Sequence, residues 1–482
     1  MTIRDLEPRA VWEQFDGITR VPRPSKKEGR IIEYLVEFAR RNGIECKRDR
    51  IGNVVMRRPA AAGCEDRPTV ILQSHMDMVC EKNSDVDFDF ETDPIRTRVE
   101  AGWVRAEGTT LGADCGIGMA AALAVMIDSE TKYGALEALF TVDEETGLTG
   151  AFGLGEGMLT GKYLINLDSE DEGEIFIGCA GGIDTVAEFR YKREAAPKGY
   201  VFYRFDVSEL VGGHSGDDID KGRANSNKIA TRLLYEAQGR YDARLSYMDG
   251  GNLRNAIPRE AYAVFGIPAK MRSAFEERYA AFAEEVKEEF RLTDPDMRLS
   301  LSEMPDVGEV MDAESQRRLV GAAMCVANGV VAMSQAVKGL VETSTNLASV
   351  KFVGEDRIVV TTSQRSSVES AKLYAMQTVE AAFALAGAEV SHSDGYPGWT
   401  PDPDSRLLRL TEECYRRLFG AEPKVRAVHA GLECGLFLEK YPELEMVSFG
   451  PTIRGVHSPD ERLEIATVDK FWRLLREVVK SI

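Results

Sequence analysis

The sequence has few histidines, no long apolar run, no paired cysteines and no basic stripe. Only five of its 482 residues are histidine. No apolar stretch approaches the ~20 residues of a membrane helix, so we expect no membrane partner. The eight cysteines form no CxxC pair, which argues against a thiolate zinc knuckle or a disulfide framework. A net charge of −19 without concentrated Lys and Arg argues against a nucleic-acid partner. Any metal should therefore have nitrogen and oxygen ligands.

The length and composition indicate a globular chain with more than one folded region. A chain of 482 residues exceeds what one hydrophobic core usually supports, so we expect two domains or one domain with a large insertion. The first eight residues contain neither the apolar core nor the cleavage site of a secretory signal. We therefore expect a cytoplasmic location.

The first feature that indicates chemistry is the pair His75 and Asp77, which follows the apolar run Val70–Leu72. Residues two apart leave a strand on the same side. This geometry suits a metal ligand and the carboxylate that orients it, although a hydrogen-bonded pair at a strand end would look the same.

Acidic residues recur in similar positions. Asp143-Glu144-Glu145 and Asp168 follow apolar runs that predict strands over 136–142 and 163–167. Asp114 precedes an Ala-rich run over 117–127 that predicts a buried helix, which Asp114 could simply cap. Ligands of α/β sheets gather beyond the carboxyl ends of strands, so these residues are predicted to form a metal site.

The residue pattern of the chain changes near residue 185. Alternating segments and a predicted helix over 225–238 indicate an α+β region, and a similar succession over 299–388, with a helix over 366–386, suggests an internal duplication. The Gly- and Pro-rich stretch 394–399 predicts a return linker. We expect a first domain split into residues 1–185 and 395–482, with residues 186–394 inserted as a second domain.

Six motifs, in order along nearly the whole chain, resemble those of the aminoacyl-histidine dipeptidases. This family is the peptidase D type of cytosolic dipeptidase, a distant relative of carboxypeptidase G, aminoacylase and peptidase T. The motifs are Ser74-His75-Met76-Asp77-Met78-Val79, Leu111-Gly112-Ala113-Asp114, Asp143-Glu144-Glu145-Thr146-Gly147, Gly213-His214-Ser215-Gly216, His429-Ala430-Gly431-Leu432-Glu433-Cys434-Gly435 and Gly455-Val456-His457-Ser458-Pro459. The resemblance implies an α/β fold with a zinc-peptidase-like catalytic domain, built on a mixed sheet and split by an inserted α+β lid.

The resemblance also implies a centre of two zinc ions, with manganese or cobalt as alternatives. Asp114 would bridge the ions; His75 and Asp168 would hold one, and Glu145 and His457 the other. Imidazole and carboxylate are usual ligands of catalytic zinc. By the same resemblance Glu144 would be the general base, and Asp77 would fix the tautomer of His75.

The resemblance assigns four residues to substrate, three in the inserted region and one, Gly431, in the second part of the catalytic domain. His214 would polarise the scissile carbonyl. Asn255 and Arg365 would bind the terminal carboxylate, and Gly431 would add a backbone donor. Three of them have simpler alternatives: His214 and Asn255 could be turn residues, and Arg365 a salt-bridge partner at a helix start. His429 and Glu433 have no role that the sequence reveals. Cys115 is predicted to be a small buried residue that fills space in the core, and not a zinc ligand.

We therefore expect hydrolysis of dipeptides, especially those with C-terminal histidine such as β-alanyl-histidine. An amidohydrolase acting on N-acyl amino acids is the alternative, because relatives use the same metal core for that reaction. A catalytically silent metal-binding protein is a third reading, against which the complete set of ligands and base argues. Whether the chain forms a homodimer stays open.

Overall fold

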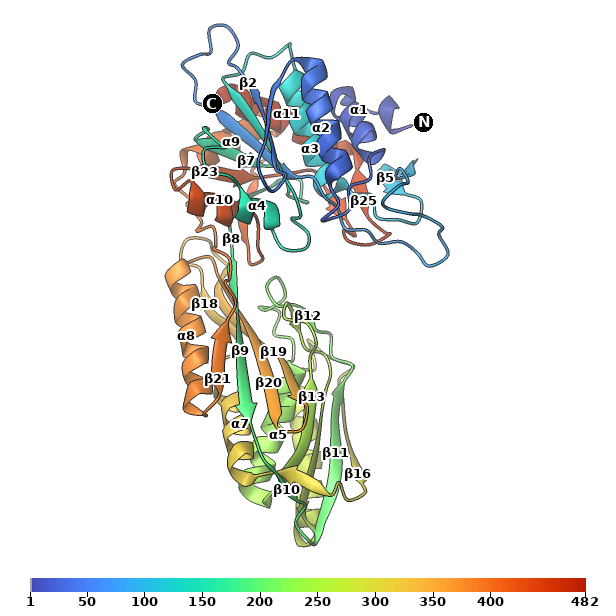
Figure 1. Ribbon diagram of the computed structural model, residues 1–482, viewed down its shortest axis with the longest axis vertical. Helices are drawn as coiled ribbons and strands as arrows, with labels where there is room; N and C mark the ends of the chain where they lie inside the picture. Colours follow the sequence, from blue (N-terminus) through green and yellow to red (C-terminus); the bar gives the residue numbers. More distant parts are fainter. Residues whose placement is uncertain (1) are drawn as a thin grey trace. The chain divides into compact units, whose positions relative to one another are not determined.

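The computed structural model describes residues 2–482, which form two compact units (Figure 1). The first unit comprises the described residues up to Gly178 together with Pro401–Ala427 and Glu433–Ile482. The second unit comprises Cys179–Thr400 and the short segment Val428–Leu432. The chain thus enters the second unit twice.

The first unit is built on an eight-stranded mixed sheet. Its strands, in spatial order, are β1 (Glu45–Arg48), β2 (Val54–Arg58), β6 (Leu136–Thr141), β3 (Val70–His75), β7 (Tyr163–Asn166), β23 (Glu445–Ser448), β8 (Glu174–Cys179) and β22 (Lys424–Val428). Strands β6, β3, β7 and β23 run parallel, so their carboxyl ends lie at one edge. A four-stranded sheet joins β24 (Ile453–Arg454), β25 (Arg462–Glu464), β5 (Trp103–Ala106) and β4 (Thr97–Glu100).

The helices of the first unit flank these sheets. They are the 3-10 helix Ile3–Asp5, α1 (Arg9–Thr19), α2 (Gly29–Asn42), α3 (Ala113–Ile127), α4 (Thr149–Gly153), α9 (Arg406–Phe419), α10 (Cys434–Lys440) and α11 (Ile465–Ser481). Helix α3 packs between α1 and strands β3 and β6. It is apolar on all sides, as a helix in the centre of a large core must be.

The second unit is built on a nine-stranded antiparallel sheet. Its path is β16 (Arg298–Met304), β11 (Tyr200–Ser208), β15 (Ala261–Pro268), β13 (Arg244–Gly250), β19 (Val341–Val353), β20 (Arg357–Ser366), β9 (Gly181–Arg190) and β21 (Glu389–His392), with β18 (Gly329–Met333) beside β19. Two small pairs join β10 (Arg193–Ala195) to β17 (Glu309–Met311) and β12 (Gly213–His214) to β14 (Ala256–Ile257).

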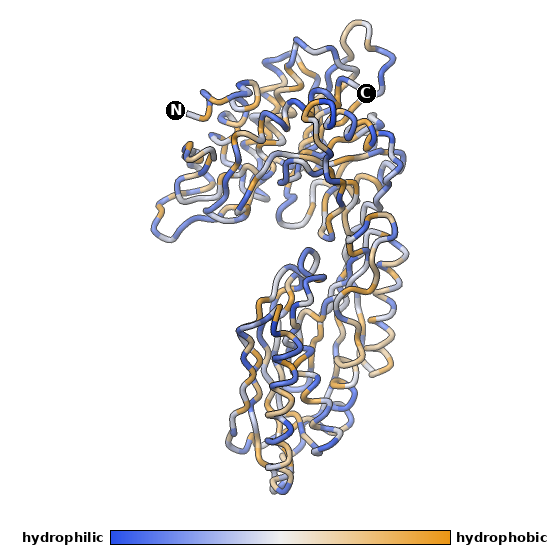
Figure 2. The backbone as a smooth tube through the Cα atoms, turned by 180° about the vertical axis from the view of Figure 1, so that it is seen from behind, coloured by the Kyte–Doolittle hydropathy of each residue, from blue (hydrophilic) through white to orange (hydrophobic). Residues whose placement is uncertain are grey.

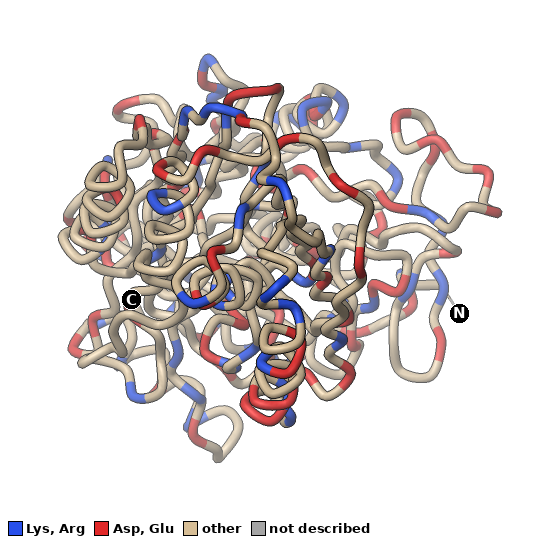
Figure 3. Tube along the Cα trace, turned by 90° about the horizontal axis from the view of Figure 1, so that it is seen from below, with Lys and Arg blue, Asp and Glu red and all other residues tan. Residues whose placement is uncertain are grey.

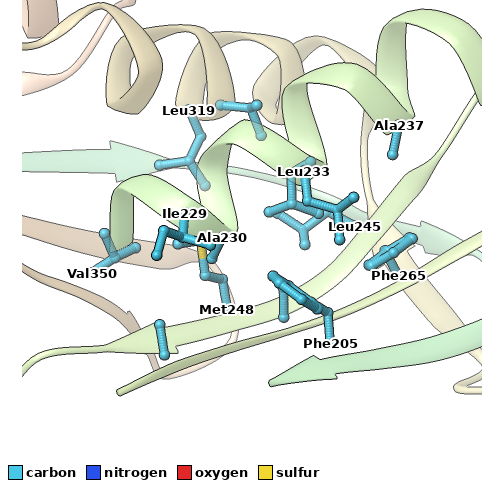
Figure 4. Close-up of a cluster of buried hydrophobic side chains, with 14 of the residues drawn as sticks. Phe205, Ile229, Ala230, Leu233, Ala237, Leu245, Met248, Phe265, Leu319 and Val350 are labelled. Carbon is cyan, nitrogen blue, oxygen red and sulfur yellow. The ribbon is translucent and has the colours of Figure 1, made fainter. Parts of the chain in front are cut away.

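Helices form a layer against this sheet. They are α5 (Ser226–Tyr241), α6 (Arg272–Glu289), α7 (Ala313–Cys325) and α8 (Glu369–Leu385), with a 3-10 turn at Ala269–Met271. Figure 4 shows Leu233 and Ile229 of α5 directed toward Phe205, Leu245 and Phe265 of the strands. In β9 and β11, successive residues alternate between buried and partly exposed positions, as expected for a sheet with one face against helices. Figure 2 shows hydrophobic and hydrophilic residues intermixed along the chain.

The topology of the second unit repeats. The first set of elements runs in chain order through β11, α5, β13, β15, α6 and β16. The second set begins with β9, which precedes the first set in the chain, and continues after it with α7, β19, β20, α8 and β21. In the sheet the two sets meet at the β13–β19 pair, and outward from it the order is β15, β11, β16 on one side and β20, β9, β21 on the other. This nested repeat of strand–helix–strand–strand–helix–strand supports the predicted duplication.

The predicted elements agree with the structure except at some ends. The helix predicted over 366–386 begins at Glu369, because β20 continues through Ser366 and forms ladder pairs with β9 and β19. Acidic and basic residues are interspersed along the chain (Figure 3). Within residues 2–482, no helix combines the length and apolar character needed to span a membrane.

Candidate metal centre and substrate-binding residues

The carboxyl edge of the first unit's sheet gathers the predicted ligands around Asp114. Asp114 Oδ1 lies 3.3 Å from His75 Nε2, and Asp114 Oδ2 lies 3.3 Å from His457 Nε2. His75 Nε2 is also 3.2 Å from Asp168 Oδ1, and His457 Nε2 is 3.0 Å from Glu145 Oε2. The two carboxylate oxygens of Asp114 thus face two different histidines, each paired with a second carboxylate.

The spacing of these atoms fits two divalent cations. Zinc bonds of about 2.0–2.1 Å to nitrogen and oxygen in a tetrahedron place neighbouring ligand atoms roughly 3.4 Å apart, close to the four separations observed. Asp168 Oδ1 and Glu145 Oε1 are buried without a hydrogen-bond partner in residues 2–482. Oxygens left unsatisfied in this way are suited to cations.

Asp77 lies behind His75 and organises the neighbouring loop. Its Oδ1 is 3.3 Å from His75 Nδ1, which leaves His75 Nε2 facing Asp114. The backbone N–H groups of Glu144 and Glu145 donate to the two oxygens of Asp77 at 3.0 and 3.2 Å, and Ser25 Oγ donates at 2.8 Å. One carboxylate therefore lies beside the ring nitrogen of a metal-ligand candidate and holds the backbone that carries two glutamates.

Glu144 lies among these groups, and within residues 2–482 no Lys or Arg forms an ion pair with it. One oxygen of Glu144, one of Glu145 and a ring nitrogen of His75 lie within 4.8 Å of one another. Burial raises the pKa of Glu144 well above its usual value, and Asp168, Glu433 and Glu145 raise it further, while His75 opposes them. A carboxyl group with a raised pKa beside the cluster is suited to proton transfer.

Cys115 Sγ also lies near His75 and Asp168, but it donates to the carbonyl of Leu167 at 3.2 Å.

Glu461 holds the loop that presents Asp114. Its Oε2 accepts from the N–H groups of Leu111 and Gly112 at 2.7 and 2.9 Å, and its Oε1 accepts from Ala113 at 2.7 Å. The side chain is buried, and the N–H groups that donate to it lie at the start of α3, where backbone N–H groups have no helical partner. The sequence analysis missed this residue, although it stands four positions after His457.

Replacing Glu461 by Gln should destabilise the first unit. The amide group would place N–H donors against backbone N–H donors, so we expect the free energy of unfolding to fall by about 2–3 kcal/mol. Chemical denaturation measures the loss. Glu443→Gln, at an exposed position, is the matched control and should leave stability unchanged; equal stability of both variants would contradict the role given to Glu461.

In the second unit the side chain of His214 is partly exposed and is held through its Nδ1. The N–H groups of Gly216 and Asp217 lie 3.3 and 3.2 Å from its Nδ1 and donate to it. Burial lowers the pKa of His214, and Arg365 lowers it further, so the ring is neutral with its proton on Nε2. A neutral imidazole with a directed Nε2–H group can donate to a carbonyl oxygen.

The predicted carboxylate-binding residues also belong to the second unit. Arg365 is buried, and within residues 2–482 it forms no ion pair with an acidic side chain. Asn255 is exposed, and its carbonyl accepts from the N–H of Ser215, next to His214. A Cβ at Gly431 would lie 3.0 Å from the ring of Tyr396, whose hydroxyl accepts a hydrogen bond from Arg365. The structure therefore brings Arg365 and Gly431 to the same tyrosine.

His429 is a buried neutral histidine of the same unit. Its Nε2 lies 2.7 Å from Ser344 Oγ, and Ser344 pairs with Arg365 across the β19–β20 ladder. Burial lowers the pKa of His429 to about 3, and the charge of Arg365 acts in the same direction. The side chain keeps its neutral form at all pH values where the protein would ordinarily be studied.

This depressed pKa should make the second unit sensitive to acid. The unfolded chain binds a proton at His429 below pH ~6.5 and the folded chain does not, so stability falls as pH decreases from that value toward 3. Between pH 7 and 5 wild type should lose about 2 kcal/mol that His429→Gln does not lose. Denaturant unfolding at the two pH values measures this difference. Equal losses in both proteins would exclude the effect, and His392→Gln serves as the control.

Glu433, which had no assigned role, is part of a buried network behind the centre. Its Oε2 accepts from Gln73 Nε2 at 2.6 Å and from Thr141 Oγ1 at 2.7 Å, and these donors lie on the adjacent strands β3 and β6. Burial raises the pKa of Glu433 to about 8. It thus joins the start of α10 to the strands that end at His75 and Thr141.

Comparison with known proteins places the chain in a family. Residues 71–481 match the peptidase family M20/M25/M40. The cytosol non-specific dipeptidase of Escherichia coli K12 is 42% identical over 480 residues, covering 100% of this chain and 99% of that protein. The crystal structure of an aminoacylhistidine dipeptidase from Vibrio alginolyticus has a TM-score of 0.94 at 42% identity, covering 100% and 98% of the two chains.

A more distant structure shares the fold. The aminopeptidase PepT of Bacillus cereus has a TM-score of 0.58 at 16% identity, covering 98% of each chain. The fold and the matched residues define a peptidase of the mixed α/β type with two units. The chain belongs to peptidase family M20/M25/M40, which confirms the predicted relationship and the predicted hydrolase class.

Proposed function

We propose that this chain is a metal-dependent dipeptidase, acting especially on dipeptides with C-terminal histidine such as β-alanyl-histidine. One observation carries the proposal: the two oxygens of Asp114 face His75 and His457, each at 3.3 Å, and each histidine has a further carboxylate beside it. The names of the relatives from E. coli and V. alginolyticus support dipeptides as substrates. The name of the E. coli relative also supports a cytosolic location.

In this proposal Asp114, His75, Asp168, Glu145 and His457 hold two zinc ions, with manganese or cobalt as alternatives. The ligand types do not select among these metals. When bound, the ions supply Lewis acidity to the scissile carbonyl and lower the pKa of the attacking water. Asp77 keeps His75 in the tautomer that directs Nε2 toward Asp114.

The remaining steps belong to side chains. Glu144 takes the proton of the attacking water and later gives it to the leaving amine, a transfer suited to its raised pKa. His214 donates from Nε2 to the oxygen that gains negative charge. Arg365 and Asn255, with the backbone of Gly431, bind the terminal carboxylate, because a guanidinium forms paired hydrogen bonds with a carboxylate.

The deciding experiment compares β-alanyl-histidine, alanyl-histidine and N-acetyl-histidine with protein stripped by chelator and then refilled with zinc, manganese or cobalt. We expect metal to restore cleavage of the two free dipeptides only. Cleavage of the acetylated compound alone would instead indicate an N-acyl-amino-acid amidohydrolase, and full activity of the stripped protein would exclude metal dependence. Light scattering of the refilled protein would show whether it is a homodimer.

A further inference from the structure

Arg365 of the second unit carries a buried charge that has no acidic partner among residues 2–482. Its exposed fraction is 7%, and its Nε is buried and lacks a hydrogen-bond acceptor in the described part of the chain. A buried guanidinium without an anion is costly, so this charge is suited to a ligand that brings one. The nearby Lys372 differs, because it pairs with Glu369 and donates to the carbonyl of Tyr396.

Tyr396 provides the hydrogen bond that orients this guanidinium. Arg365 Nη1 donates to the Tyr396 hydroxyl at 3.0 Å. The hydrogen bond engages one terminal nitrogen, and the Nε group has no acceptor in the part of the chain that the structure describes. Paired recognition of a carboxylate uses two N–H groups on one edge of the guanidinium, so the orientation of that plane decides the affinity.

The sheet makes this contact possible through Gly182. Arg365 on β20 pairs with Gly182 on β9, and Gly182 in turn forms a bridge with Tyr396 on its other side. The three residues therefore lie in one row across the sheet. A Cβ at Gly182 would lie 2.7 Å from the ring and hydroxyl atoms of Tyr396, so only glycine lets the ring reach over the middle position to Arg365.

The backbone of Tyr396 is held from several directions. Its N–H donates to the carbonyl of Gly182 at 2.8 Å, and its carbonyl accepts from Gly182 and from Lys372 Nζ. Gly431 allows a close approach to the ring from another side. Burial keeps the neighbours His214 and His429 neutral, so neither adds a second positive charge beside Arg365.

We propose that Tyr396, lying over Gly182, is the positioning residue that sets the guanidinium plane of Arg365 for the terminal carboxylate of the substrate. This inference rests on the proposed function for the identity of the substrate. It adds a residue pair, Tyr396 and Gly182, which acts through Arg365 and takes no part in the proton transfers.

The test compares Tyr396→Phe with wild type on alanyl-histidine and on alanyl-histidine amide, which lacks the carboxylate. Loss of one hydrogen bond to a charged group should raise KM for the free dipeptide about tenfold, with kcat changed less than twofold and the amide unaffected. Tyr374→Phe, at an exposed position of α8, is the matched control. Gly182→Ala should raise the same KM, because its Cβ displaces the ring while the hydroxyl is retained.

A double-mutant cycle shows whether Tyr396 acts through Arg365. In an Arg365→Ala background, Tyr396→Phe should have no further effect on KM. An equal effect in both backgrounds, an unchanged KM, or a matching loss for the amide would overturn the inference.

Calorimetry separates failure of the inference from failure of the proposed function. Binding of histidine and of histidinamide to wild type and Tyr396→Phe does not require catalysis. If wild type cleaves no dipeptide, the proposed function fails, but weaker binding of histidine alone to Tyr396→Phe would still support the inference. No preference of wild type for histidine over histidinamide would overturn it.

Discussion

Glu144→Gln should reduce kcat for dipeptide cleavage about a thousandfold and leave KM and metal content nearly unchanged. Glutamine keeps the size of the side chain but can neither accept the proton of water nor return it to the leaving amine, and such transfer contributes typically 10²–10⁴-fold. Because Asp77 binds the backbone of Glu144 rather than its side chain, the loop should keep its conformation. Steady-state kinetics and metal analysis of the same preparation measure both quantities.

The variants of Glu144 and Glu145 distinguish the general base from a metal ligand. Glu145 Oε2 lies 3.0 Å from His457 Nε2, so Glu145→Gln should lower metal content together with activity. Glu156→Gln, at an exposed position in the same unit, should change neither quantity. If Glu144→Gln retained more than a tenth of wild-type kcat with full metal content, another group would have to be the base.

The gathering of the candidate ligands at strand ends could be predicted from the sequence. Each strand is indicated by a local apolar run, and the carboxyl ends of parallel strands meet at one edge of a sheet. The apolar runs before His75, Asp143 and Asp168 became β3, β6 and β7, which lie side by side and run parallel. Their carboxyl ends therefore meet at one edge, as expected for α/β sheets. Asp114 joins them because α3 begins beside β3.

Contacts that depend on register or on distant segments could not be predicted from local pattern. His457 reaches Asp114 from the far end of the chain, and only the resemblance to a family indicated it. The row of Arg365, Gly182 and Tyr396 follows from the pairing of β9 with β20 and from the bridge to the return segment, and no spacing in the sequence encodes it. Glu461 was missed for a similar reason, since the groups that donate to its carboxylate are backbone N–H groups, which carry no side-chain signal.

The return of Val428–Leu432 to the second unit was also outside the reach of pattern analysis. The N–H of Ala180 lies 3.1 Å from the carbonyl of Val428 and 3.0 Å from that of Ala430 and donates to both. This places His429 and Gly431 with Arg365, while Glu433, two residues beyond Gly431, belongs to the first unit. One motif in the sequence thus serves two folded units.

Asp114→Asn should have the largest effect on metal binding, because Asp114 is the residue shared by both halves of the centre. Its Oδ1 faces His75 and its Oδ2 faces His457, whereas each other proposed ligand belongs to one half only. An amide presents one oxygen and one NH2 group, and the NH2 group cannot bind a cation. We expect metal content to fall from two ions per chain to one or fewer, and kcat to fall more than a thousandfold.

Elemental analysis after dialysis against a fixed free zinc concentration measures the stoichiometry, and thermal unfolding gives a readout independent of activity. Ions that bind only the folded chain raise its Tm, so chelator should lower the Tm of wild type much more than that of Asp114→Asn. Asp87→Asn, an exposed carboxylate of the same unit, should bind metal as wild type does. His457→Ala should lose the ion held with Glu145 and retain the ion held with His75 and Asp168. Two ions bound with full affinity in Asp114→Asn would mean that the halves are filled independently, and the two oxygens of Asp114 would then need another role.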